Sequence, residues 1–69
     1  PNASYALYYK ALLLVEGDDL DAADVAMDSA LENGLSEDRL PDYISAIIAK
    51  GKYLRAIKWR LQFNNRSQE

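Results

Sequence analysis

The segments EGDDLDAAD at residues 16–24 and KGKYLRAIK at residues 50–58 decide how this 69-residue chain folds. Placed over each other with Gly17 on Gly51, they share a glycine, a leucine and an alanine. Four of the five acidic residues in the first segment become Lys or Arg in the second. This pattern indicates a helix–turn–helix unit that occurs twice, with its charge inverted in the second copy.

Apolar residues recur at a spacing near 3.6 along the whole chain, and no stretch alternates long enough to predict a strand. The predicted helices run from Asn2 or Ser4 to Glu16, from Leu20 to Asn33, from Leu40 to Lys50, and from Lys52 or Tyr53 to about Asn64. The connections within each pair are two or three residues long, which is typical of antiparallel helices. The sequence therefore predicts an all-α fold of two antiparallel helix hairpins.

Glycine marks the predicted helix ends. Gly17 and Gly51 are expected to end the helices before them, and Asn33-Gly34-Leu35 has the form of a C-cap with a left-handed glycine. Pro41 is expected in the first turn of its helix, because proline has no N–H to donate.

We expect residues 1–69 to be a single small helical domain or a repeat fragment excised from a longer chain, with hairpins at residues 3–34 and 36–66. A core of this size supplies only roughly 3–5 kcal/mol unless a disulfide, a metal or a partner helps. Because the chain has no cysteine and no histidine, a partner is the expected source of help. The same absence removes the usual nucleophile–base pairs, so we predict no enzyme, no catalytic residue, no cofactor and no metal site.

The offset between the two aligned glycines matches a period of roughly 34 residues, the signature length of the tetratricopeptide repeat, and the chain resembles that family. The segment GKYLRAI at residues 51–57 carries a turn glycine, an aromatic residue and a small residue in an arrangement similar to the family's. The resemblance implies a right-handed stack of hairpins in a scaffold, co-chaperone or assembly factor. The family's carboxylate clamp is not implied, because Lys10 has no matching asparagine. Two alternatives stay open, namely the related RNA-binding pentatricopeptide repeat and an unrelated four-helix bundle.

The first and last predicted helices are too apolar for so small a protein, which predicts that another chain or a further repeat covers them. The first helix is apolar around nearly its whole circumference, and its tyrosines either line a peptide groove or lie in the core. On the last helix, we expect Leu54, Ile57 and Leu61 to face inward and Ala56, Trp59 and Phe63 to form an exposed stripe. The predicted binding residues are Tyr5, Tyr8, Tyr9, Lys10, Ala56, Trp59, Arg60 and Phe63.

The charge of the chain is divided between its two ends. In residues 1–34 one lysine stands against seven acids, a net charge of −6, whereas in residues 35–69 seven basic residues stand against four acids, a net charge of +3. In stacked hairpins, equivalent positions lie side by side, which predicts electrostatic pairing of Asp21 and Asp24 with Arg55 and Lys58. Each exposed pair contributes only roughly 0–1 kcal/mol. We therefore expect these charges to set the order of hairpins, within the chain or head to tail between chains.

We predict a protein partner or self-association, and nucleic-acid binding by the basic last helix is the alternative. Four cations with two aromatic residues could contact phosphates and stack on bases, although the acidic half weakens this footprint; these residues are Lys52, Tyr53, Arg55, Lys58, Trp59 and Arg60. The longest apolar run, at residues 11–15, is far shorter than a membrane span, and no leader opens the chain. The sequence predicts a soluble, cytoplasmic protein, in keeping with its lack of cysteine.

Overall fold

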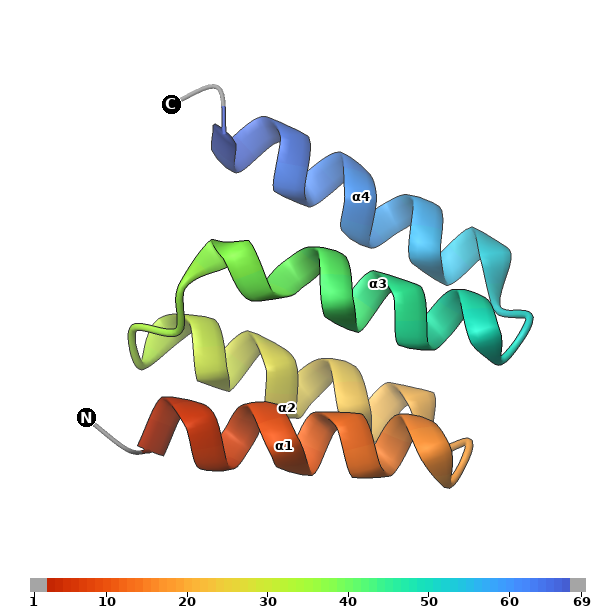
Figure 1. Ribbon diagram of the computed structural model, residues 1–69, viewed down its shortest axis with the longest axis horizontal. Coiled ribbons are helices and arrows are strands. Elements are labelled where there is room, and N and C mark those ends of the chain that lie inside the picture. Colours follow the sequence, from red (N-terminus) through yellow and green to blue (C-terminus); the bar gives the residue numbers. More distant parts are fainter. Residues whose placement is uncertain (1–2, 68–69) are drawn as a thin grey trace. The chain divides into compact units, whose positions relative to one another are not determined.

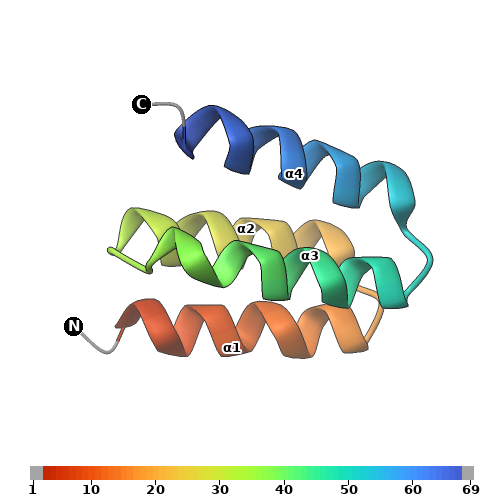
Figure 2. The same cartoon turned by 45° about the horizontal axis from the view of Figure 1, so that its top comes forward.

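Two antiparallel pairs of helices make up the chain in the computed structural model, which describes residues 3–67 and only the backbone of the last two of these. The elements are α1 (Ala3–Glu16), α2 (Leu20–Glu32), the 3-10 helix η1 (Glu37–Arg39), α3 (Leu40–Ala49) and α4 (Tyr53–Ser67). The chain reverses direction after α1 and again after α3, and each pair packs together (Figure 1; Figure 2). Within the described residues no strand occurs, which confirms the all-α fold of two helical hairpins.

The chain divides between Ser36 and Glu37 into two compact units, each of which holds one hairpin. We call α1–α2 the first hairpin and α3–α4 the second hairpin. Their bounds agree with the predicted ones except at the chain ends. Ser4 is a buried residue inside α1 rather than its cap, and the other predicted cap, Asn2, lies outside the described residues. The last helix continues past Asn64 to Ser67.

Three helices of the described chain end in the same backbone motif. At each end one N–H bonds to the carbonyl three residues back and the next N–H bonds to the carbonyl five residues back, which is the Schellman arrangement. The N–H of Asp18 lies 3.0 Å from the Val15 carbonyl oxygen, and that of Asp19 lies 2.9 Å from the Leu14 oxygen. The same pair of bonds is made after α2 and after α3.

The left-handed residue of this motif is glycine at two of the three ends. Gly34 has φ 97° and Gly51 has φ 76°, as expected for the residue type. After α1, however, Asp18 takes this conformation, with φ 64°, and Gly17 does not. The prediction that Gly17 plays the role of Gly51 is therefore wrong by one residue, because the helix has its last turn one residue later in relation to the glycine.

The first hairpin buries one stripe from each helix. The alanine-rich face of α2 is the predicted one, and it packs against a stripe of α1 that recurs every three or four residues. The buried residues of the two helices are Ser4, Tyr8, Ala11, Val15, Leu20, Ala23, Ala26, Met27 and Ala30. Small side chains on α2 permit a close approach of the two helices.

The second hairpin is built around an aromatic contact. The rings of Tyr43 on α3 and Trp59 on α4 meet edge to face, with centroids 5.3 Å apart and planes at 83°. The buried residues of α3 and α4 are Leu40, Tyr43, Ile44, Ile47, Ala56 and Trp59.

The orientation predicted for the last helix is wrong. Trp59 is only 4% exposed, whereas Leu54, which was expected to face inward, is 79% exposed. Ile57 and Leu61 are exposed as well, Ala56 is buried and Phe63 is half-buried. The helix is thus rotated so that the stripe with Ala56 and Trp59 meets α3, because a small residue and a large flat one fit against Tyr43.

Candidate functional site

An apolar groove runs between α3 and α4 and has a volume of about 370 Å³. Each helix contributes four residues at positions i, i+3, i+4 and i+7, the spacing that places side chains on one face. The lining residues are Pro41, Ile44, Ser45 and Ile48 from α3 and Tyr53, Ala56, Ile57 and Arg60 from α4. At a rise of 1.5 Å per residue, these rows are about 10 Å long, or two helical turns.

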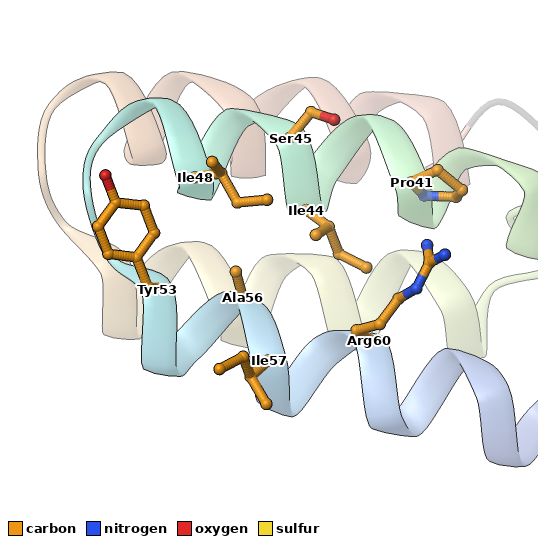
Figure 3. A pocket seen from close by; sticks show the side chains of 8 residues that line it. All are labelled: Pro41, Ile44, Ser45, Ile48, Tyr53, Ala56, Ile57 and Arg60. Carbon is orange, nitrogen blue, oxygen red and sulfur yellow. The ribbon is translucent and has the colours of Figure 1, made fainter.

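The floor and the walls of this groove differ in depth. Ile44 and Ala56 are buried, and their side chains point into the space between the two helices (Figure 3). Ile48 and Ile57 stand beside them and are about half exposed. The short side chain of Ala56 therefore leaves a depression between larger apolar neighbours, which is the shape that receives a side chain from a packing helix.

The two ends of the groove are polar. Tyr53 stands at the end near the α3–α4 turn, and Arg60 reaches toward Pro41 at the other end (Figure 3). The guanidinium carbon of Arg60 lies 5.9 Å from the centroid of the Phe63 ring, within the range of a cation–π contact. This contact holds the one charged residue of the lining at the end of the groove.

The exposed apolar surface extends beyond the groove along α4. Tyr53, Ile57 and Leu61 follow one another at intervals of four residues, and Leu54 lies beside this row. All four side chains are at least half exposed. Clustered apolar surface of this kind is typical of interaction sites rather than of a freely solvated helix.

The first hairpin has a hollow of its own, with a volume of about 400 Å³ between α1 and α2. Its lining residues are Leu7, Lys10, Leu14, Ala22, Val25, Ala26 and Ser29. We call it the α1–α2 hollow. Exposed acidic residues lie on the same helix as Val25, namely Asp21, Asp28 and Glu32.

The predicted binding residues fall into separate places. Ala56 and Arg60 line the α3–α4 groove, whereas Lys10 lines the α1–α2 hollow. Tyr8 and Trp59 are buried, so neither forms an exposed edge, and Phe63 is half-buried beneath Arg60.

Tyr5 and Tyr9 are exposed and form, with Leu13, a row on a different face of α1 from the hollow. Their spacing of four residues aligns them along the helix. The ring of Tyr9 also lies 5.3 Å from that of the buried Tyr8. The surplus of apolar surface that the sequence indicated on the first helix is therefore located on this row.

The predicted electrostatic residues lie on α2 and α4. Asp21 and Lys58 are exposed, and Asp24 and Arg55 are half-buried. Their pairing across the two hairpins stays a prediction. The nucleic-acid alternative keeps exposed Lys52, Tyr53, Lys58 and Arg60 but loses a stacking surface, because the Trp59 ring is buried against Tyr43.

Sequence reasoning missed most of the groove, including Ile44, Ile48, Tyr53 and Ile57. The available signal was the repeated spacing of 41, 44, 45, 48 and of 53, 56, 57, 60 on two consecutive helices. It was overlooked because Ile57 was assigned to the inward face.

Among the side chains that the structure describes, no three His, Cys, Asp or Glu residues gather to hold a metal ion. None of the helices within residues 3–67 combines the length and the apolar character needed to cross a membrane. Comparison of the chain with protein families, with curated proteins and with solved structures finds no match in any of the three. The resemblance to tetratricopeptide repeats therefore stays a prediction.

Proposed function

We propose that this chain is a non-enzymatic protein-interaction module, of the kind found in scaffolds, co-chaperones and assembly factors, that docks a protein segment or a sister subunit in the α3–α4 groove. The observation that carries the proposal is the open groove itself, with Ile48, Tyr53 and Ile57 exposed over a floor of Ile44 and Ala56. Apolar grooves two helical turns long are suited to the apolar face of an amphipathic helix. A reducing compartment such as the cytoplasm is the proposed setting, since the chain has no cysteine.

The composition of the groove supports binding of protein. Interface centres favour aromatic, aliphatic and arginine side chains and are poor in lysine and acids. The groove lining has one tyrosine, three isoleucines and one arginine, and it contains no lysine and no carboxylate.

Selection from a random peptide display library on the immobilised chain tests this proposal. Selected peptides should bind at least about 10-fold more weakly to an Ile57→Asp variant, because a carboxylate would then face the apolar ligand in the groove. Gln62→Asp is the matched control, since Gln62 is exposed on the opposite side of α4 and gains the same charge. Peptides that bind both variants alike, or a library that yields no binder, would contradict the proposed function.

A further inference from the structure

We propose that the α3–α4 groove binds the first hairpin of a second copy of this chain, so that copies associate head to tail. The proposal rests on the proposed function and names the occupant of the groove. Its argument compares each open face with the equivalent face of the other hairpin.

The two hairpins correspond in structure when Asp18 is placed on Gly51, because these are the left-handed residues of their turns. At the same offset, the ends of the first helices coincide, at Glu16 and Ala49. The starts of the second helices coincide as well, at Leu20 and Tyr53. Each residue of one hairpin therefore has a defined structural counterpart in the other.

The face that forms the groove in the second hairpin is buried in the first hairpin. Of the eight lining residues, six have counterparts that are at most 7% exposed, namely Tyr8, Ala11, Val15, Leu20, Ala23 and Met27. The counterparts of Ser45 and Ile57 are half-buried Leu12 and Asp24. The groove is thus the open form of a face that this sequence pattern buries.

The reverse holds for the α1–α2 hollow. The counterparts of Leu7, Lys10, Leu14 and Ala26 are buried in the second hairpin, namely Leu40, Tyr43, Ile47 and Trp59. The remaining counterparts are half-buried or exposed, and these are Arg55, Lys58 and Gln62. Each hairpin therefore leaves open a face that its counterpart buries wholly or in large part.

Two different open faces on one chain suit a heterologous contact. If the α1–α2 hollow of one copy covers the α3–α4 groove of another, both faces are buried by one interface. Such a head-to-tail contact leaves a free hollow at one end of the pair and a free groove at the other. Further copies can therefore add to the pair.

Charge favours this pairing over the pairing of identical faces. Residues 1–36 carry a net charge of −6 and residues 37–69 carry +3, since seven basic residues there stand against four acids. Groove against groove would bring two basic units together, and hollow against hollow would bring two acidic units together. Like charges at an interface are penalised, whereas opposite charges also speed encounter.

Two substitutions at exposed positions block one face each. Ile57→Asp places a carboxylate in the groove, and Val25→Arg places a cation in the hollow; these side chains are 53% and 66% exposed, so neither change disturbs a core. Gln62→Asp and Leu13→Arg are the matched controls, because they make the same charge changes at exposed positions outside the groove and the hollow. Far-UV circular dichroism verifies that all four variants keep their helices.

Sedimentation equilibrium over a range of concentrations measures association. The weight-average mass of the unaltered chain should rise above the 7.8 kDa of one chain, and past that of a dimer. Each blocking variant alone should associate at least about 10-fold more weakly. A mixture of the two should form a dimer, because Ile57→Asp retains a working hollow and Val25→Arg retains a working groove.

A chain that stays monomeric, or a mixture that fails to associate, would overturn the head-to-tail proposal. Pairing of identical faces would overturn it too, and it would appear as full dimerisation of one blocking variant by itself. If peptides selected on the groove bind while the chain stays monomeric, the proposed function stands and only the second copy as occupant is wrong.

Discussion

Asp18 adopts a backbone conformation that glycine adopts at the equivalent turn of the second hairpin. At Gly51 an added Cβ would meet no atom within 4 Å, so a substitution there strains the backbone without a clash. At Gly17 an added Cβ would make ordinary contacts of 3.7 and 3.8 Å with two carbonyl oxygens, and its φ lies outside the left-handed region. Two glycines that the sequence aligns thus differ in what they require.

Gly51→Ala should lower the free energy of unfolding by about 1–2 kcal/mol, which is the steric cost of a left-handed L-residue. Gly17→Ala should leave it unchanged or raise it by up to about 1 kcal/mol, because alanine loses less entropy on folding. Urea titration followed by circular dichroism measures both changes. Equal losses at the two sites would show that Gly17, rather than Asp18, is the counterpart of Gly51.

The rotation of α4 determines which of its apolar stripes is buried and which forms a surface. Ala56 and Trp59 turn toward α3, where the Trp59 ring meets Tyr43. Aromatic residues bury more area than aliphatic ones and gain further from edge-to-face contact. As a consequence Leu54, Ile57 and Leu61 remain on the outside, where they border the groove.

Trp59→Ala should destabilise the fold by about 3–5 kcal/mol, the usual range for a large aromatic residue removed from a core. Because a domain of this size has roughly 3–5 kcal/mol in total, the variant should lose its cooperative unfolding transition. Leu54→Ala, on the same helix, should change stability by no more than about 0.5 kcal/mol. Thermal unfolding of both variants decides the matter, and a comparable loss at Leu54 would mean that α4 is rotated as the sequence suggested.

At the scale of the whole molecule, the two hairpins carry opposite net charges. The acids gather on α2 and the turn before it, and α4 contains four basic residues and no acid. Exposed charges of this kind contribute little to folding and much to the choice and orientation of a partner.

The charge inversion predicts coupling between Asp21 and Arg55. Asp21→Arg and Arg55→Asp should each weaken self-association by up to about 5-fold, and the double exchange should restore it, because an opposite pair is re-formed. Association constants from sedimentation at low salt give the four corners of the cycle, since salt screens exposed pairs. Losses that simply add would show that the two positions do not interact.

Local chemistry placed the helices and the turns. Gly34, Gly51 and Pro41 constrain the backbone at their own positions, so the helix ends near them followed from residue type alone. The alanine face of α2 was also readable, because its small residues fall on one side and its acids on the other. The α3–α4 groove was not readable in this way.

The sequence by itself thus determined where each helix lies and that the helices form two hairpins. Only the tertiary structure decided which stripe of α4 is buried, and with it that Trp59 is a core residue and Ile57 a surface one. Both stripes are apolar, so the helical period cannot distinguish them. The choice depends on how the side chains of α4 fit the shape of α3, where Ala56 gives close approach and Trp59 packs on Tyr43.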